Sequence, residues 1–376
     1  MRIGIMLRTF DEKGGIGVYS RNLVQELLSI DNENQYTLFY RSPEHLGNYQ
    51  SRSNVIERYI PGANKLIWDQ IMIPIACRRE KIDVLFHPKF TVPLFAPCKT
   101  IMVVHGADWF MPDQAQYYDR LDVAYIRAVM PLYFKKCSRV ISVSELTTQN
   151  FYRVLDLPPG KIKTIYFGPA KFFKPISDPQ KLRKVKQQFN LPDDFILTLT
   201  KIKGDGRKNF GQLIAAYADY HQSVKDPAPL VVGGKDCHLF KNEYSIPDDS
   251  FGRDVHFPGW IHQEDLPAVY NSALVFLYPS NLEAFPIPIT EAMACGTPVI
   301  TSNVNGLIEI AGDSALFVNP QKPSEIAEGI RQMLRDQAVR QSYSTRGLAR
   351  SKHFTWDKCA AETLITIDEV YKRKDP

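Results

Sequence analysis

The sequence lacks the marks of several protein classes. Its six cysteines include no C-x-x-C pair, which excludes a zinc knuckle and a thioredoxin-like motif. Thiols scattered over a chain of this size indicate a reducing compartment. No apolar run approaches the ~20 residues that cross a bilayer, and the first residues carry no signal-peptide pattern. We therefore expect a cytoplasmic protein, either soluble or peripheral on the inner face of a membrane.

A strong net charge is also absent. Lys and Arg total 46 against 41 Asp and Glu, and a formal net charge of +5 is too mild and too evenly spread to indicate a nucleic-acid partner. Aromatic residues make up 11% of the chain, which excludes global disorder. A length of 376 residues suggests two domains as the simplest organisation, with a core that needs neither disulfides nor a metal.

Short apolar runs alternate with helical patterns in the first half. Strand patterns lie at residues 3–7, 36–40, 55–59, 84–87, 100–105, 139–143 and 163–166. Helical periodicity fills residues 18–28, 66–79, 121–137 and 147–154. This alternation predicts an α/β domain, with a parallel sheet covered by helices on both faces.

The same alternation restarts after a segment rich in breakers at residues 167–179, which we interpret as a linker. Strands are expected at residues 195–200, 230–232, 255–257, 274–278, 299–302 and 316–318. Helices are expected at residues 209–220, 266–271, 288–294, 323–335 and 357–372. Two doubly wound halves facing one another would form a cleft, with ligands beyond the carboxyl ends of the strands.

The strongest motif runs from Glu283 to residue 298. Pro288 suits the first turn of a helix and Gly296 its end. A helix start favours an anion, and we expect Glu291 in its first turn. Two carboxylates at such a place are unusual unless they accept hydrogen bonds from hydroxyls of a sugar or a ribose. For Glu283 or Glu291 alone, a surface residue or a favourable first-turn acid is the commoner explanation.

Two further loops are suited to phosphate. The loop at residues 13–20 offers Gly15 and Gly17 before a helix expected to open at Val18, but it is neither a Walker loop nor a G-x-G-x-x-G fingerprint. A plain tight turn explains this loop equally well. The loop at residues 201–209 is basic and suits a diphosphate, although most charge runs are simply solvated.

The string from Glu283 to residue 298 closely resembles the Glu-x7-Glu signature of the retaining GT-B glycosyltransferases of glycosyltransferase family 4. The resemblance covers nearly the whole chain. It implies two Rossmann-like doubly wound domains facing across a cleft: an acceptor-side domain at residues 1–175 and a nucleotide-sugar donor domain at residues 176–355. The last segment, residues 356–376, would be a helix that crosses back to the first domain.

The resemblance also implies roles for individual residues. Glu283 would lie beside the donor sugar and the transferred carbon, and Lys208 would reach the diphosphate. His105, which follows an apolar strand, would lie near the outer hydroxyls of the donor sugar, although a lone His at a strand end is usually a satisfied polar group. The remaining donor contacts implied are Gly15, Gly17, Lys201, Arg207, Phe285, Ile287 and Glu291. Pro286 has no N–H to give, so the amide contacts rest on Phe285 and Ile287.

The function implied is transfer of a hexose from a UDP- or GDP-linked sugar to a hydroxyl of a saccharide or lipid-linked acceptor, with retention, in polysaccharide or glycoconjugate synthesis. No cofactor and no metal are implied, and the sequence offers no Asp-x-Asp at a strand end. The alternatives are a sugar-nucleotide epimerase and a GT-B protein that binds a sugar nucleotide without transfer. A dehydrogenase is disfavoured because the dinucleotide fingerprint is missing.

Residues 117–137 combine aromatic and apolar side chains with Arg127, Lys135 and Lys136. This pattern suits peripheral contact with an anionic membrane. Core residues beside a wet basic edge explain it at least as well.

Overall fold

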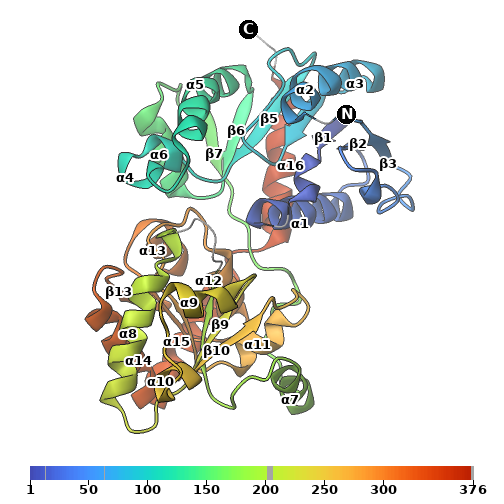
Figure 1. Cartoon of the computed structure of the whole chain (residues 1–376). Helices are drawn as coiled ribbons and strands as arrows, with labels where there is room; N and C mark the ends of the chain where they lie inside the picture. The colour runs from blue at the N-terminus through green and yellow to red at the C-terminus, as the bar shows by residue number, and fades with distance from the viewer. Residues whose placement is uncertain (13, 63, 201–205, 374–376) are drawn as a thin grey trace. The chain divides into compact units, whose positions relative to one another are not determined.

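A computed structural model describes residues 1–12, 14–62, 64–200 and 206–373 (Figure 1). The chain divides into two compact units, which are described separately. Unit 1 holds Met1–Phe167 together with the chain from Thr355 onward, and unit 2 holds Gly168–Phe354. The sequence predicted a domain boundary after residue 175, whereas the division by contacts falls after Phe167, eight residues earlier.

Unit 1 is built on a parallel sheet whose described strands are ordered β3-β2-β1-β4-β5-β6-β7. The strands are β1 (Arg2–Met6), β2 (Gln35–Tyr40), β3 (Val55–Tyr59), β4 (Val84–His87), β5 (Lys99–Val104), β6 (Arg139–Ser142) and β7 (Ile162–Thr164). Most of their residues are buried, as expected for a parallel sheet covered on both faces.

The longer helices of unit 1 are α1 (Gly15–Ile30), α3 (Ile73–Glu80), α5 (Arg120–Lys136), α6 (Glu145–Val154) and α16 (Trp356–Lys372). The shorter ones are η1 (Arg8–Asp11), η2 (Pro43–His45), α2 (Lys65–Ile67), η3 (Trp68–Met72), η4 (Asp108–Phe110) and α4 (Pro112–Ala115). Helix α16 returns to the first unit, where it packs against α1, β4 and β5. Its first residue, Trp356, lies against the rings of Tyr19 and Phe167.

Unit 2 repeats the plan with a parallel sheet whose described strands are ordered β10-β9-β8-β11-β12-β13. These strands are β8 (Ile196–Leu199), β9 (Leu230–Gly233), β10 (Val255–Gly259), β11 (Val275–Tyr278), β12 (Val299–Ser302) and β13 (Ala315–Val318). Its longer helices are α7 (Pro179–Gln188), α8 (Phe210–Ser223), α12 (Ile287–Ala294), α14 (Pro323–Arg335) and α15 (Gln337–Ser351). Its shorter ones are η5 (Gly206–Lys208), η6 (Cys237–Leu239), α9 (Phe240–Glu243), α10 (Ser250–Arg253), α11 (Leu266–Ser272) and α13 (Asn305–Ala311).

Each sheet has a point at which the strand order reverses. In unit 1 this point lies between β1 and β4, and in unit 2 it lies between β8 and β11. Connections on either side of such a point leave in opposite directions, which opens a crevice at the carboxyl ends of the two strands. The loops after these four strands are therefore the places where ligands are expected.

The expected strands are confirmed within one or two residues at each end, and those at 55–59, 84–87 and 299–302 match. Three expectations need correction. Helix α1 begins at Gly15 rather than at Val18, the helix expected at 66–79 contains the π-helical turn η3, and α7, α13 and α15 were not expected at all. The polar exposed faces of α7 and α15 left too few apolar positions for a clear period. No described helix is both long and apolar enough to span a bilayer.

Candidate functional site

Lys208 and Glu283 meet at the carboxyl edge of the unit 2 sheet. Lys208 closes the turn η5 after β8, and Glu283 follows β11, the strand beside β8. Their Nζ and Oε1 atoms lie 2.5 Å apart, and only 19% and 16% of their side-chain surfaces are exposed. Strand order thus joins two predicted site residues that are 75 positions apart in the sequence.

Two hydroxyl groups complete the surroundings of the Glu283 carboxylate. Tyr278 donates a hydrogen bond to Glu283 Oε1 at 2.8 Å, and the Ser280 hydroxyl, whose one hydrogen is shared with the Arg207 carbonyl, lies 3.1 Å from the same carboxylate oxygen. The Lys208 ammonium also contacts the Tyr278 hydroxyl and lies 4.8 Å from the centre of its ring. Burial lowers the pKa of Lys208, but the charge of Glu283 and the Tyr278 hydroxyl outweigh it, so the net shift is upward and Lys208 stays protonated. Sequence reasoning missed Tyr278 and Ser280 because neither belongs to a motif.

Asn209 fixes the turn that carries Lys208. Its backbone has a φ of 57°, in the left-handed region that Asn tolerates better than most residues. Its buried amide donates to the carbonyl oxygens of Pro279 and Pro320 at 3.0 and 2.7 Å. These bonds tie the turn to the end of β11, so Asn209 holds Lys208 opposite Glu283. Asn209 is a third residue that the sequence analysis did not single out.

Helix α12 ends as the motif predicted and begins at Ile287, one residue before the expected start. Pro288 lies in its first turn, where a missing N–H is tolerated. Past its end, Gly296 has a φ of 79°, and its N–H donates to the Met293 carbonyl at 3.0 Å. The N–H of Thr297 donates to the Ala292 carbonyl at 2.9 Å, which completes a Schellman motif.

Glu291 lies in the second turn of α12 rather than in the first, because the helix begins at Ile287. This corrects the sequence-based placement. The carboxylate is buried and accepts a hydrogen bond from the Tyr270 hydroxyl at 3.1 Å. Burial raises the pKa of Glu291 to about 7, although the bond from Tyr270 acts in the opposite direction. Its charge therefore changes near neutral pH.

The loop between Glu283 and α12 is fixed by a hydrogen bond from α13 and by a turn of its own. The N–H of Gly306, in α13, donates to the Glu283 carbonyl at 3.1 Å, and a Cβ at Gly306 would lie 2.5 Å from the Ala284 carbonyl oxygen. The Ile287 N–H donates to the Phe285 carbonyl at 3.1 Å. The Ile287 amide is thus already engaged in a turn, and the geometry gives no support to its expected contact with a sugar hydroxyl.

The basic loop after β8 is described only in part. Lys201 lies outside the described residues. The carbonyl of Arg207 accepts hydrogen bonds from the Asn281 N–H at 2.6 Å and from the Ser280 hydroxyl at 2.8 Å. Arg207 therefore lies in the same turn as Lys208, joined through its backbone to the segment that leads to Glu283.

In unit 1, His105 follows β5 at the carboxyl edge of the sheet. Its Nε2 lies 2.9 Å from the Pro88 carbonyl oxygen, which fixes Nε2 as the protonated nitrogen of the neutral ring. The ring is nearly perpendicular to the Tyr19 ring, in a T-shaped contact with centroids 4.8 Å apart. Burial lowers the pKa of His105 to about 4, although the bond to Pro88 opposes this shift. His105 is thus neutral at pH 7 and offers Nδ1 as an acceptor.

Gly15 and Gly17 form the first turn of α1. A Cβ at Gly17 would lie 1.8 Å from the Glu12 carbonyl oxygen, whereas one at Gly14 would meet nothing within 4 Å. Gly17 is therefore required for the close approach of η1 to α1. This packing requirement is a reason for glycine that the sequence analysis did not anticipate.

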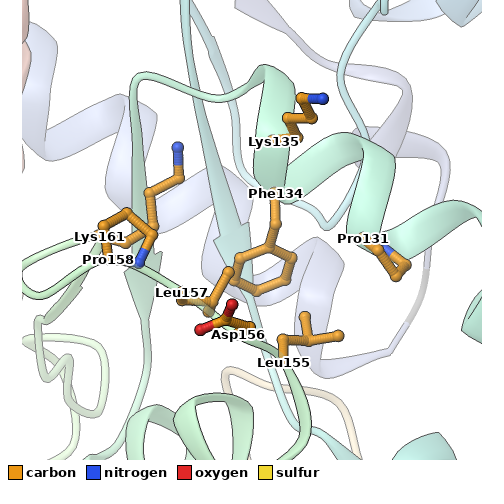
Figure 2. A pocket seen from close by; sticks show the side chains of 8 residues that line it. All are labelled: Pro131, Phe134, Lys135, Leu155, Asp156, Leu157, Pro158 and Lys161. Atoms are coloured by element: carbon orange, nitrogen blue, oxygen red, sulfur yellow. The ribbon is translucent and has the colours of Figure 1, made fainter.

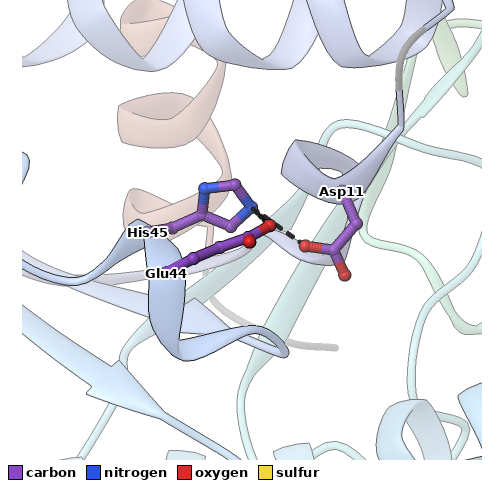
Figure 3. Close-up of side chains that lie close together, drawn as sticks. All are labelled: Asp11, Glu44 and His45. Atoms are coloured by element: carbon purple, nitrogen blue, oxygen red, sulfur yellow. Dashed lines mark hydrogen bonds and ion pairs between the residues drawn. The ribbon is translucent and has the colours of Figure 1, made fainter.

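Two other features of unit 1 contain none of the predicted site residues. Asp11, Glu44 and His45 form the one group among the described residues that could hold a metal ion (Figure 3). His45 Nε2 already bonds Asp11 Oδ1 at 2.9 Å, and Glu44 is exposed. A cavity of about 360 Å³ lies between the end of α5 and residues 155–161 (Figure 2). It includes Lys161, just before β7, at the amino edge of the sheet and away from the strand ends where ligands are expected.

The same fold occurs in solved glycosyltransferase structures. Sucrose-phosphate synthase from Thermosynechococcus elongatus matches with a TM-score of 0.77 at 22% identity, over 99% of both chains. Two doubly wound α/β units with this topology define the GT-B class of glycosyltransferases.

The sequence agrees with this class. Residues 13–168 match the model of Glycosyltransferase Family 4, and residues 181–350 match the model of Glycosyl transferases group 1. The chain belongs to the glycosyltransferase family that these two models describe.

Two relatives come from Escherichia coli. O-antigen chain mannosyltransferase B is 28% identical over 292 residues, which cover 76% of this chain and 74% of the relative. The serotype-specific mannosyltransferase WbdA is 24% identical over 357 residues, which cover 90% of this chain. The chain spans less than half the length of WbdA, at 43%.

Proposed function

We propose that this glycosyltransferase moves a hexose from a nucleotide diphosphate sugar to a hydroxyl of a saccharide or lipid-linked acceptor, with retention at the anomeric carbon. The observation that carries the proposal is the Lys208–Glu283 pair at the strand-order reversal of unit 2. A fixed ammonium beside a helix start suits a diphosphate leaving group. The mannosyltransferase relatives favour GDP-mannose among the UDP- and GDP-linked donors.

The proposed roles follow from the contacts. Lys208, kept protonated, stabilises the charge that develops on the leaving diphosphate, with Arg207 and Lys201 on the same loop. Glu283, oriented by Tyr278 and Ser280, holds the donor sugar with its second carboxylate oxygen. Glu291 accepts hydrogen bonds from the ribose, and the leaving phosphate oxygen takes the proton of the acceptor hydroxyl.

A donor panel tests the proposal. The purified chain is incubated with GDP-mannose, UDP-glucose and UDP-galactose, with and without neutral mannose oligosaccharides, and released nucleoside diphosphate is measured. We expect one donor to be consumed faster when an acceptor is present, and proton NMR of the product to show the anomeric configuration of the donor. An inverted product would contradict the retaining mechanism.

The same assay separates the alternatives. An epimerase would change the sugar of the donor without an acceptor, and a binding protein would be stabilised thermally by a donor without releasing nucleoside diphosphate. Either result would contradict transfer.

Metal independence is part of the proposal, because Lys208 supplies the positive charge that a metal would otherwise give to the diphosphate. Activity after treatment with EDTA and gel filtration should equal that of the untreated protein. If activity is lost and Mg²⁺ or Mn²⁺ restores it, the proposed role of Lys208 is insufficient.

We also propose peripheral contact with an anionic membrane through α5. Its outer face exposes Leu121 by 80%, Tyr125 by 51% and Leu132 by 50%, beside the exposed cations Arg127 and Lys135. Apolar side chains that enter the interface and cations that face anionic headgroups are the combination that peripheral helices use.

Flotation with vesicles tests the contact. The protein should float with phosphatidylcholine vesicles that contain phosphatidylglycerol and not with phosphatidylcholine alone. Leu121→Asp with Leu132→Asp should abolish flotation. Ile365→Asp, on the exposed face of α16, should not. Equal flotation of all three proteins would contradict the assignment to α5.

A further inference from the structure

Unit 1 carries a second cation–carboxylate pair at its own strand-order reversal. Glu12 follows β1 and η1, and Lys89 follows β4, the strand beside β1. Lys89 Nζ and Glu12 Oε1 lie 2.6 Å apart, with 15% and 29% of the side chains exposed. The arrangement matches Lys208 and Glu283 of unit 2, except that the acid and the cation have exchanged strands.

A buried hydrogen-bond network of Arg8, Asp69 and Thr91 lies next to this pair. Arg8 Nε donates to Asp69 Oδ1 at 2.9 Å, Arg8 Nη2 donates to the Thr91 hydroxyl at 3.1 Å, and Thr91 donates to Asp69 Oδ2 at 2.9 Å. Arg8 Nη1 also lies 3.9 Å from Glu12 Oε1, which links the network to the pair. Asp69 belongs to the π-helical turn η3, a feature that occurs frequently at functional sites.

The neighbourhood of the pair is a site rather than a plain surface. Glu12 precedes the glycine turn of α1, and Gly17 lacks a Cβ where the Glu12 carbonyl approaches. His105 bonds to Pro88, the residue before Lys89, and the charges of Lys89 and Glu12 both act on its ring. The partly exposed pair therefore stands beside the residues of unit 1 that the proposed function already uses.

We propose that Glu12 and Lys89 form the subsite that binds the acceptor, and that they select an uncharged sugar. This rests on the proposed function. A hydroxyl both donates and accepts, so two neighbouring hydroxyls of a sugar can donate to the Glu12 carboxylate and accept from the Lys89 ammonium. Among the described contacts, Arg8 pairs with Asp69 and Lys89 pairs with Glu12. A phosphate group at this pair would meet an ammonium that Glu12 already neutralises, and it would be repelled by the Glu12 carboxylate.

Two probes that differ by one phosphate test the selection. Mannose and mannose 6-phosphate are titrated into the full chain, saturated with GDP, and their dissociation constants are measured by ligand-observed NMR. The wild-type chain should prefer the neutral probe. Glu12→Gln leaves one net positive charge and should shift the preference about tenfold toward the phosphate probe. Lys89→Met should shift it in the opposite direction.

A matched pair controls for the loss of any surface ion pair. Arg58→Met and Glu80→Gln remove a contact of 2.7 Å at the outer face of unit 1 and should leave both dissociation constants unchanged. Three results would overturn the subsite. The first is an unchanged preference in both Glu12→Gln and Lys89→Met, and the second is the same shift in the control variants. The third is that neither probe binds to the wild type. A wild type with the expected preference that turns over no nucleotide sugar supports the subsite and contradicts the proposed function.

Discussion

The buried carboxyl group of Glu291 makes the stability of unit 2 depend on pH in a predictable direction. Its pKa is raised from 4.5 to about 7 by burial in α12, with the Tyr270 bond opposing the shift. The folded state therefore binds a proton more tightly than the unfolded chain. Stability from this group is fully present below pH 4.5 and is lost as the pH rises through 7.

The magnitude follows from the two pKa values. Between pH 5 and pH 8 the contribution of Glu291 falls by about 2–3 kcal/mol. For a unit of this size, 1 kcal/mol changes the melting temperature by about 2–4 °C, so about 5–10 °C is expected. Glu291→Gln keeps an acceptor for Tyr270 but cannot ionise, so it removes this contribution.

The assay is calorimetric melting of wild type and Glu291→Gln at half-unit steps from pH 5 to 8. The melting temperature of Glu291→Gln minus that of the wild type should increase steadily as the pH rises. Glu328→Gln, at an exposed side chain of α14, gives the background. Two parallel curves would refute the reasoning, because a carboxyl group with an ordinary pKa would not titrate in this range.

Three further predictions concern catalysis and packing. Lys208→Met and Glu283→Gln should each lower kcat/KM at least about 100-fold. The kcat/KM of the double variant should be little lower than that of the less active single variant, because the two residues act as a unit. Additive losses would show that they act independently. His105→Asn should lower activity without changing the shape of the pH–rate profile between pH 6 and 8, because a ring with a pKa of about 4 does not titrate there. A rise or fall of activity with pH that is present in the wild type and absent from the variant would contradict this. Gly17→Ala should lower unfolding free energy by about 2 kcal/mol or more, because its Cβ would lie 1.8 Å from the Glu12 carbonyl oxygen, while Gly14→Ala, with open space around it, should melt near the wild type.

The fold was predictable because most of its elements have a local signature. Buried parallel strands read as short apolar runs, and amphipathic helices read as a period near 3.6. The fold class and the glycosyltransferase family are confirmed. Elements with weaker patterns were missed, as α15 shows with its mostly polar surface. The start of α1 was misplaced because glycines lack helix propensity, and here packing of Gly17 against Glu12 overrides that preference.

The candidate site was predictable only in part. The Glu283 and Glu291 motif and the basic loop around Lys208 stand out as strings of residues. Tyr278, Ser280 and Asn209 do not, because each acts through a contact with a distant segment. The roles of the motif residues stay predictions, and the structure changes how two are understood: Glu291 is buried in the second turn of α12, and the Ile287 amide is used within its own turn.

The sequence by itself determined most of the elements of this protein, their order along the chain and the residue types in the loops that follow each strand. Only the tertiary structure decided which loops become neighbours. Glu12 and Lys89 are 77 positions apart, and Lys208 and Glu283 are 75 apart, yet each pair meets because the strand before one residue lies beside the strand before the other. Strand order is set by packing of whole helices and strands, and no local pattern of residues encodes it.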